Sequence, residues 1–484
     1  MSAIRPGRAE QPRTHAGGER TEAAPVVVIG GGLAGLAAAA ALVEAGRAVM
    51  LLEARRRCGG RAASFADATG DGLVDACQHV AMGCCTNFLD LCRRTGLAAA
   101  LRRDRTLVFI GPDAARAECT PAAWLPAPLH LAPLLLGMKH FTLGEKTSLA
   151  RGMVRLAAVR PDSVHPDSAT DQPTALEWLR AIGQPDAVIR LFWQPVLESA
   201  LGESIDLVSV TAARKVAVDG FLGHPQAADL WVPTEPLGML FGERLVDWLV
   251  GRGVDVRTGT AVTALERDAA GRVTGVRCGA ATFPCSAVVL AVAWRQAARL
   301  VGDVVPAADE RLAGSPITAV HLWFDRPVID LPHAVLVGRV SQWVFRPDEA
   351  ADHGYCQVVI SASRGLLGGD RERLVDTVVA ELRDIFPAAR DARLVEAKVV
   401  TDPTAVLSVR PGVEAVRPPA RTAVTNLFLA GDWTATGWPS TMEGAVRSGR
   451  LAADALAAEV RIPHRSLVGD LPRGRLVRLF AGSR

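Results

Sequence analysis

Residues 26–53 read VVVIGGGLAGLAAAAALVEAGRAVMLLE, and this stretch decides the fold of the chain. It opens with an apolar run at 26–29, passes through a glycine-rich turn into an alanine-rich segment at 33–45, and ends in a second apolar run at 48–52. Two short apolar runs on either side of a helix-forming segment are typical of a β-α-β unit. We therefore predict that the folded part of the chain begins with a parallel sheet.

The glycine-rich turn carries the pattern Gly30-x-Gly32-x-x-Gly35. Because it follows a predicted strand and opens a predicted helix, it aims backbone N–H groups and the positive end of the helix dipole at a pyrophosphate. Gly30 makes the tight turn, Gly32 lets phosphate approach, and Gly35 lets helix and sheet pack closely. Glu53 follows about 20 residues later, where its carboxylate can accept hydrogen bonds from a ribose diol. We expect a dinucleotide with a free 2′-hydroxyl group.

Two further segments favour FAD over NAD. Gly59-Gly60-Arg61 comes soon after the ribose carboxylate, so the backbone can pass near the cofactor and Arg61 can donate to phosphate or flavin. Residues 427–449, LFLAGDWTATGWPSTMEGAVRSG, repeat the strand, turn and helix start. Asp432 can accept hydrogen bonds from ribityl hydroxyls, and the amides at 442–445 can stabilise negative charge on a reduced flavin. NAD has no group for this second site to hold, so the predicted cofactor is FAD.

The length and the order of the predicted elements imply two interleaved domains. A chain of 484 residues exceeds the roughly 250 to 300 residues of a single core. We predict a disordered tail at 1–24, an FAD-binding domain built from 25–100, 225–300 and 420–460, a substrate-binding or cap domain built from 101–224 and 301–419, and a C-terminal tail at 461–484. The region from about 100 to 225 reads as mostly helical, and 440–456 reads as the last helix. The predicted fold class is α/β, with a Rossmann-like FAD-binding domain interleaved with a substrate domain of mixed sheet and helices.

Composition excludes several classes of protein. The formal net charge is only +3 and the basic residues are spread along the chain, so nucleic acid is not an expected partner. The nine cysteines form an odd set without Cys-x-x-Cys spacing, which supports neither a disulfide framework nor a metal site. Reduced thiols in the cytoplasm are expected. No stretch reaches the ~20 apolar residues that cross a bilayer.

Both ends of the chain resemble the amine oxidase and phytoene desaturase superfamily of FAD proteins. Within it, residues 74–80 (VDACQHV), 83–87 (GCCTN) and 437–445 (GWPSTMEGA) are similar to hydroxysqualene dehydroxylases. The resemblance implies an oxidoreductase of isoprenoid metabolism in which reduced flavin delivers hydride to a C30 hydroxysqualene as water leaves, giving squalene for hopanoid or related synthesis. It also implies a long apolar isoprenoid substrate. The electron donor to FAD stays open.

The candidate site residues follow from these motifs and this resemblance. His79 is the candidate acid that protonates the leaving oxygen, and Gln78 the orienting donor; a histidine that only holds backbone near a cofactor is the competing role. The predicted cofactor-binding residues are Gly30, Gly32, Leu33, Ala34, Gly35, Glu53, Ala54, Arg55, Gly60, Arg61, Val262, Gly431, Asp432, Met442 and Ala445. Val262 rests on the resemblance, since it matches the position where the superfamily stacks backbone against adenine.

The apolar segment from Trp124 to Met138 has two interpretations. Leu, Ala and Trp crowd around three prolines, and Lys139 and His140 follow. The segment is either a membrane-contacting mouth, through which a C30 chain enters at the inner face of a membrane, or a buried cap helix broken by prolines.

Three other functions stay open at this point. A carotenoid-type desaturase or isomerase would take hydride from a polyene precursor instead of giving it. An amine oxidase would pair the flavin with an aromatic cage, and this chain has a single tyrosine, Tyr355, although Trp and Phe can also build a cage. A non-catalytic partner in a prenyl-lipid complex would hold FAD and turn over nothing.

Overall fold

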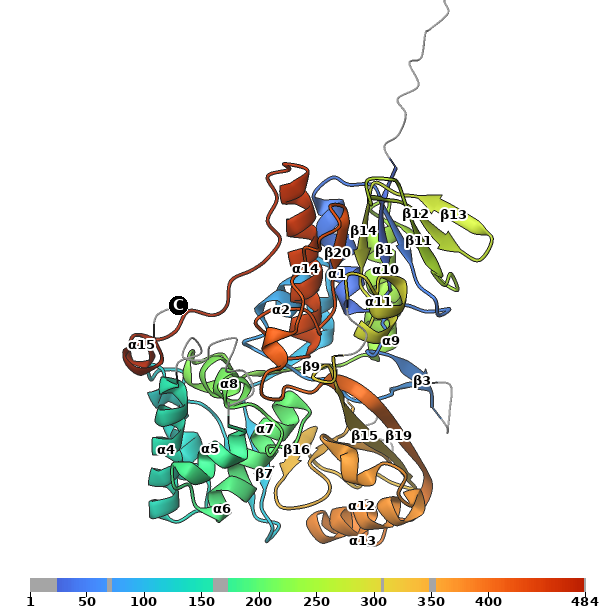
Figure 1. The fold of residues 1–484 in the computed structure, drawn as a ribbon. Coiled ribbons are helices and arrows are strands. Elements are labelled where there is room, and N and C mark those ends of the chain that lie inside the picture. Colours follow the sequence, from blue (N-terminus) through green and yellow to red (C-terminus); the bar gives the residue numbers. More distant parts are fainter. Residues whose placement is uncertain (1–23, 68–71, 160–172, 306–308, 348–353, 483–484) are drawn as a thin grey trace, which may run out of the picture.

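The computed structural model describes residues 24–67, 72–159, 173–305, 309–347 and 354–482 (Figure 1). Apart from Ala24, the predicted tail at 1–24 therefore lies outside the described residues. The first layer is a five-stranded parallel sheet in the order β10-β2-β1-β14-β20. Its strands are β1 (Val26–Ile29), β2 (Val49–Leu52), β10 (Asp255–Arg257), β14 (Ala287–Leu290) and β20 (Leu427–Leu429). The apolar runs at 26–29 and 48–52 and the strand predicted at the start of 427–449 correspond to β1, β2 and β20.

Both faces of this sheet are buried. Successive side chains of a strand point to opposite faces, so alternate residues of β1 pack on opposite sides. Val26 and Val28 pack with helices α1 (Leu33–Glu44) and α14 (Met442–Glu459). Val27 and Ile29 pack on the other side. That side is covered by α11 (Trp294–Leu300) and by the antiparallel sheet of β11 (Ala264–Arg267), β12 (Val273–Cys278) and β13 (Ala281–Pro284). Burial on both faces explains why the strands read as continuous apolar runs.

Helices α1 and α14 cross at very short range, beside the sheet (Figure 1). A Cβ atom on Gly449 would overlap the carbonyl oxygen of Ala34 and lie 2.8 Å from the backbone nitrogen of Ala38. Only glycine admits this approach without movement of one helix. The crossing joins the first helix of the described chain to a helix about four hundred residues later.

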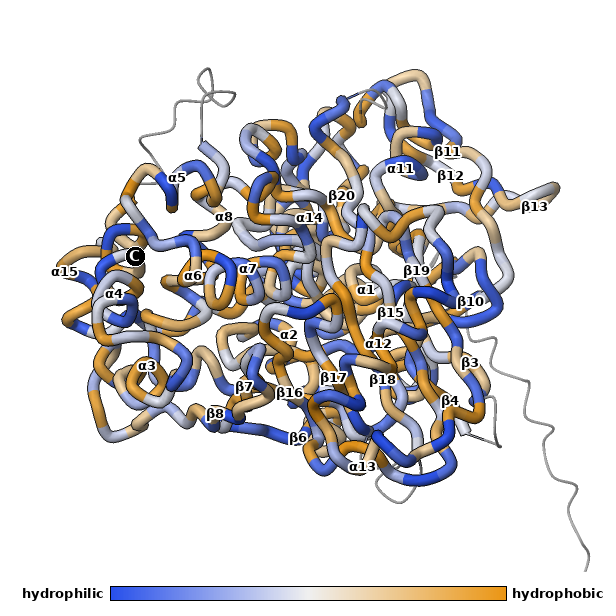
Figure 2. The backbone as a smooth tube through the Cα atoms, turned by 90° about the horizontal axis from the view of Figure 1, so that it is seen from below, coloured by the Kyte–Doolittle hydropathy of each residue, from blue (hydrophilic) through white to orange (hydrophobic). Residues whose placement is uncertain are grey.

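The second layer is a seven-stranded mixed sheet in the order β19-β15-β18-β17-β16-β7-β8. It comprises β19 (Leu394–Leu407), β15 (Gly314–Phe324), β18 (Tyr355–Ile360), β17 (Trp343–Phe345), β16 (His333–Leu336), β7 (Leu107–Ile110) and β8 (Arg116–Cys119). Helix α12 (Arg371–Ile385) packs on one face. The other face meets a helical group that includes α4 (Leu143–Ala158), α5 (Ala175–Ala181), α7 (Gln194–Leu201) and α8 (Val210–Lys215). Seen from below, α4, α5 and the C-terminal helix α15 (Arg475–Ala481) lie at the edge opposite β11 to β13 (Figure 2).

The start of the segment from 100 to 225 is stranded, not helical as predicted. β6 (Leu101–Asp104) pairs with β9 (Leu230–Pro233), and β7 and β8 join the large sheet. Phe109 of β7 pairs in parallel with Val335 of β16. Such short strands are stabilised by the strands with which they pair. The partner of β7 lies more than two hundred residues away in the chain, so no local sequence pattern reveals the pairing.

The chain beyond α14 ends in another helix, α15 (Arg475–Ala481), so the prediction that α14 is the last helix was wrong. Val477 and Ala481 of α15 are buried. Arg214 and Arg473 donate to the carbonyl oxygen of Ala481 at 2.9 and 3.0 Å. This segment of the predicted C-terminal tail is therefore packed against the rest of the chain, next to α4. A seven-residue helix has too short a periodic pattern to be recognised from sequence.

Gly449→Ala tests the helix crossing. The added methyl group forces α14 away from α1, and overpacking of this kind costs about 1 to 3 kcal/mol. We expect a lower thermal unfolding midpoint and a protein that loses bound flavin more readily. Gly365→Ala is the matched control, since a Cβ at Gly365 meets no atom within 4 Å. Equal unfolding midpoints for the two variants would contradict the close crossing.

Candidate functional site

The turn at residues 30–35 forms an open cradle of backbone. Gly30 has φ of +107°, and a Cβ there would lie 2.5 Å from the carbonyl oxygen of Ala291. A Cβ on Gly35 would overlap the carbonyl oxygen of Gly30, so turn, helix and sheet are packed as the motif predicts. Gly32 is the N-cap of α1 without a side-chain cap, and Leu33 and Ala34 begin the helix. The first N–H groups of α1 are thus free of side-chain caps and suited to a phosphate.

The loop at residues 58–61 lies directly on this turn. The N–H of Gly59 donates to the carbonyl oxygen of Gly31 at 2.8 Å. A Cβ on Gly60 would lie only 3.0 Å from the Cα atom of Gly32, and Gly60 has φ of +63°. The glycine pair therefore lets two backbone segments close around the same space.

Glu53 sits where the ribose end of a dinucleotide is expected. Its Oε2 atom accepts from the N–H of Gly31 at 2.6 Å, and its Oε1 atom accepts from the N–H of Arg55 at 2.8 Å. Ala54 and Arg55 are exposed beside it. The N–H of Thr260 donates to the Glu53 carbonyl at 2.8 Å, which brings the loop before β11, including Val262, alongside. Val262 precedes this strand, which begins at Ala264.

Asp432 forms the second anchor, at the turn between β20 and α14. Its Oδ1 atom accepts from Arg61 at 2.6 Å, and its Oδ2 atom accepts from the hydroxyl of Ser440. Burial favours a raised pKa for the Asp432 carboxyl, but the charge and hydrogen bond of Arg61 and the hydrogen bond of Ser440 outweigh it, so the pKa is lowered. Arg61 also donates to the Ala405 carbonyl at 2.6 Å. One arginine thus ties the first motif, the second motif and strand β19 together.

The start of α14 faces the same region. Gly431 has φ of +138°, and its N–H donates to the hydroxyl of Ser448 at 2.7 Å. Met442 is the first residue of α14, and Ala445 lies one turn inside it. The Thr441 hydroxyl accepts from the N–H of Gly444 at 3.1 Å, and the positive end of the dipole of this 18-residue helix lies beside Asp432.

Gln78 and His79 lie between the two layers, after β4 (Leu73–Asp75). The N–H of Gln78 donates to Oε1 of Gln357 at 2.5 Å. Nδ1 of His79 lies 2.7 Å from the carbonyl oxygen of Cys77. Because a carbonyl only accepts, Nδ1 carries the hydrogen and the lone pair of the neutral ring resides on Nε2. Burial lowers the pKa of His79, the bond to Cys77 opposes this, and the charge of Arg61 lowers it further, so the ring is neutral at pH 7.

A buried polar network that sequence reasoning missed supports this segment from the large sheet. Gln357 donates through Nε2 to the carbonyl oxygen of Asp75 at 2.9 Å. Its cross-strand partner His321 contacts the Tyr355 hydroxyl through Nδ1 at 2.9 Å. Which polar residues of β15 and β18 face each other depends on strand register, and no short stretch of sequence reveals it. Trp323 and Tyr355 are 3% and 6% exposed, so these rings fill the interior and do not form an open aromatic cage.

The family and its relatives agree with this geometry. Residues 33–457 match the family described as flavin containing amine oxidoreductase, and the chain belongs to that family. A 15-cis-phytoene desaturase from Synechococcus elongatus is 26% identical over 468 residues, covering 90% of this chain and 96% of the relative. A hydroxysqualene dehydroxylase from Rhodopseudomonas palustris is 28% identical over 450 residues, covering 90% and 99%. The solved cyclohexylamine oxidase from Brevibacterium oxydans IH-35A has a TM-score of 0.64 at 20% identity, covering 91% and 100% of the two chains, which shows a shared fold.

The protein is therefore an FAD-dependent oxidoreductase of the amine oxidase superfamily, related to carotenoid desaturases and to hydroxysqualene dehydroxylases. The fold is the α/β arrangement of mixed sheets and helices that this superfamily uses, as predicted. FAD, the predicted cofactor, fits the residues present: the side-chain-free cradle at 30–35 suits the pyrophosphate, Glu53 the ribose, and Asp432 with the start of α14 the flavin end. The assignment of individual contacts to the cofactor stays a prediction.

Glu53→Gln tests the ribose assignment. Loss of the charged acceptor removes a hydrogen bond worth about 1.5 kcal/mol, so we expect roughly tenfold weaker FAD binding. Fluorescence titration of the apoprotein with FAD measures it. Glu44→Gln, which removes an exposed charge paired with Arg94 on the same domain, is the control. Equal affinity of Glu53→Gln and the native protein would rule out this role for Glu53.

The buried His321 predicts a loss of stability in acid. Burial lowers its pKa to about 4, whereas an unfolded histidine titrates near 6.5. Between these values the unfolded chain binds a proton that the folded protein does not, so stability is complete above pH 6.5 and falls as the pH drops. From pH 7 to pH 5 this histidine removes about 2 kcal/mol. Urea unfolding of His321→Gln should show a weaker pH dependence over this range than the native protein; identical slopes would contradict the assignment.

Proposed function

We propose that this enzyme catalyses the reductive dehydroxylation of hydroxysqualene to squalene, acting on a long apolar C30 isoprenoid. The observation that carries the proposal is the position of Gln78 and His79, in the segment that resembles hydroxysqualene dehydroxylases. This segment hydrogen-bonds to Gln357 of the substrate-side sheet, and His79 lies within the electrostatic influence of Arg61, which pairs with Asp432. It is therefore close to the expected flavin end of the cofactor and to the substrate at the same time.

FAD, when bound and reduced, supplies a hydride. The residues of the chain have to exclude water, hold the substrate and give a proton to the departing hydroxyl group. His79 suits the last task, because its Nδ1 atom is held on the Cys77 carbonyl and its Nε2 atom is left to carry and release the proton. A lowered pKa makes the protonated ring scarce at pH 7 but a stronger acid once formed. The backbone N–H of Gln78 donates to the side chain of Gln357, and this bond holds the segment that carries His79.

A second candidate is desaturation of a carotenoid-type polyene precursor. The neutral ring of His79, with its lone pair on Nε2, is suited to accept a proton as well as to give one. In that case electrons would flow from substrate to oxidised cofactor. The similarity to 15-cis-phytoene desaturase, over nearly the whole of that relative, supports this candidate.

Single-turnover chemistry separates the two candidates. The enzyme is reduced anaerobically and mixed with hydroxysqualene in detergent, while the visible flavin band is followed and lipids are extracted for mass spectrometry. Dehydroxylation predicts reoxidation of the flavin with squalene formed in equal amount. A flavin that stays reduced, without squalene, contradicts the proposal; bleaching of the oxidised enzyme by a polyene precursor would then support desaturation.

His79→Ala and the pH profile test the role of the histidine. If His79 donates the proton, its removal should slow the step about 100-fold, and the native rate should rise as the pH falls toward and below 6.5, since more of the ring becomes protonated. If it accepts a proton, the native rate should be level from pH 8 to 6.5 and fall only below that, because its pKa is lowered. His464→Gln is the control histidine variant, in the segment between α14 and α15. A rate unchanged in His79→Ala would limit His79 to holding the backbone.

A further inference from the structure

One edge of the molecule exposes large apolar side chains at high fractions. Trp124, in the loop before α3 (Ala132–Gly137), is 83% exposed, and Leu479 of α15 is also 83% exposed. Leu476 of α15 is 41% exposed. Isolated exposed leucines are ordinary on protein surfaces, but a tryptophan and two leucines on adjoining elements expose more apolar surface than scattered single side chains do.

The two elements are in direct contact. Gly474, just before α15, packs on Ala127: a Cβ there would lie 3.0 Å from Cβ of Ala127. Ala127, Val477 and Ala481 belong to one buried cluster, which also receives Leu131. The short helix is thus fixed on the loop that carries Trp124, with its apolar inner face buried and its outer leucines in solvent. We call Trp124, Leu476 and Leu479, with Arg475 and Arg478, the α15 patch.

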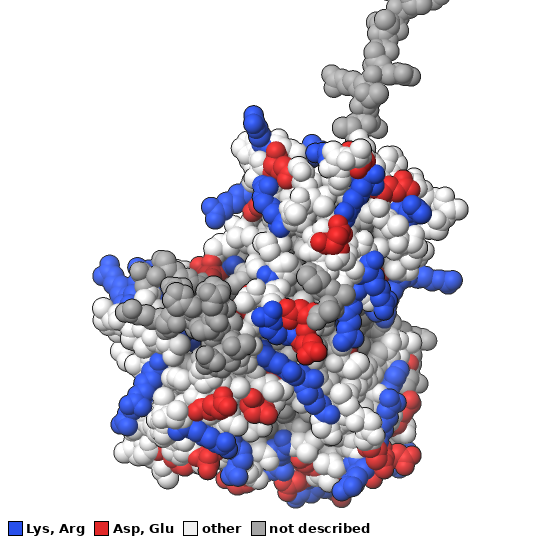
Figure 3. Space-filling view, viewed as in Figure 1, with Lys and Arg blue, Asp and Glu red and all other residues white. Residues whose placement is uncertain are grey.

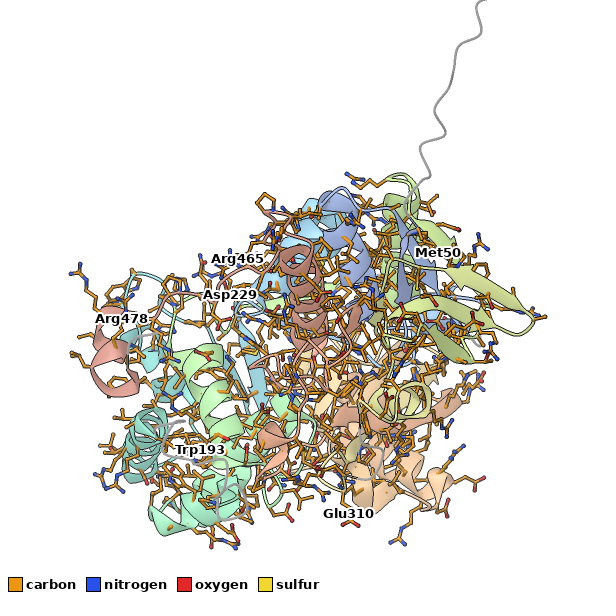
Figure 4. The ribbon with its side chains drawn as sticks, turned by 45° about the horizontal axis from the view of Figure 1, so that its top comes forward. Met50, Trp193, Asp229, Glu310, Arg465 and Arg478 are labelled. Carbon is orange, nitrogen blue, oxygen red and sulfur yellow. The ribbon has the colours of Figure 1, made fainter. Side chains whose placement is uncertain are left out.

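The charge on the patch has one sign. Arg475 and Arg478 are exposed on α15, the helix carries no acidic residue, and within the described part of the chain neither arginine forms an ion pair with a carboxylate. Figure 4 shows the Arg478 side chain extending away from the body of the molecule. Over the face in Figure 3, basic and acidic side chains are mixed, and the net charge is only +3, so any attraction to an anion has to come from such a local group.

We propose that the α15 patch is a docking surface for the face of an anionic lipid bilayer. An interfacial tryptophan, two leucines that insert among the acyl chains, and two arginines whose long side chains reach lipid phosphates are the groups that such a surface binds. Among the described residues, no helix is long and apolar enough to cross a bilayer. Trp124 lies within the family match at 33–457, whereas helix α15, which carries the other residues of the patch, lies outside it.

The patch combines the two interpretations of the segment from Trp124 to Met138. His130, Leu134 and Met138 are buried, which fits a cap element, whereas Trp124 and Leu136 are exposed, which fits a contact surface. The prolines break the segment into a loop, a short turn and α3, so one part can pack inward while another faces outward.

Flotation with vesicles tests the proposal, using the full-length holoenzyme without detergent. We expect the protein to float with vesicles of phosphatidylcholine containing about a third phosphatidylglycerol, and to bind at least tenfold more weakly to phosphatidylcholine alone or in high salt. Leu479→Glu and the pair Arg475→Gln with Arg478→Gln should each weaken binding about tenfold or more. Matched controls are Leu367→Glu, at a leucine 46% exposed elsewhere, and Arg371→Gln with Arg373→Gln, exposed on α12.

The variants should keep their flavin content and unfolding midpoint, because the altered side chains face solvent. The proposal is overturned if the native protein does not float with anionic vesicles, or if the α15 variants bind as well as the α12 and Leu367 controls. It is also overturned if sedimentation shows that the native protein self-associates through this face and Leu479→Glu makes it monomeric without changing vesicle binding.

Discussion

The crossing of α1 and α14 is the constraint on which the rest of the structure depends. A long dinucleotide has to be held at both ends, and the two turns predicted to hold it, at Gly30 and Asp432, lie about four hundred residues apart in the chain. Gly449 lets α14 approach the backbone of Ala34 and Ala38, and the parallel sheet places β1 and β20 on either side of β14. Both helices then begin at the same edge of the sheet, where the carboxyl ends of parallel strands meet. Without this close packing the Gly30 turn and the Asp432 turn would be separate, weak anion sites.

The ion pair of Arg61 and Asp432 depends on this helix crossing, and its main effect is to hold separate segments of the chain in place. Because 44% of the Arg61 side chain is exposed, water screens the pair and its contribution to the free energy of unfolding is small. This ion pair connects the loop after Glu53, the turn before α14 and, through the Ala405 carbonyl, strand β19 of the large sheet. Arg61 therefore links the large sheet to the cradle predicted to hold the cofactor.

The segment that contains Gln78 and His79 is positioned by the large mixed sheet. Gln357 holds it by a bond to its backbone and another to Asp75, and the ring of His79 is fixed in one tautomer by the Cys77 carbonyl. In the role proposed for His79, a fixed tautomer with a lowered pKa defines which nitrogen exchanges a proton, and it serves both directions of electron flow. Chemistry on this frame is thus determined by the substrate and by the redox state in which the cofactor meets it.

The sequence by itself determined the parallel sheet, the cofactor and the family. These features are local patterns: the apolar runs around Gly30 to Gly35, the acidic Glu53, and the second strand, turn and helix at Asp432. A local pattern can be recognised from sequence because the backbone conformation that needs each glycine or carboxylate is formed by its neighbours in the chain. The tertiary structure alone decided that 101–119 is stranded, that α15 packs on the loop after Trp124, and that Gln357 and His321 stand behind Gln78. These features depend on strand register and on contacts between residues far apart in the chain, and their energies come from partners that no short window of sequence contains.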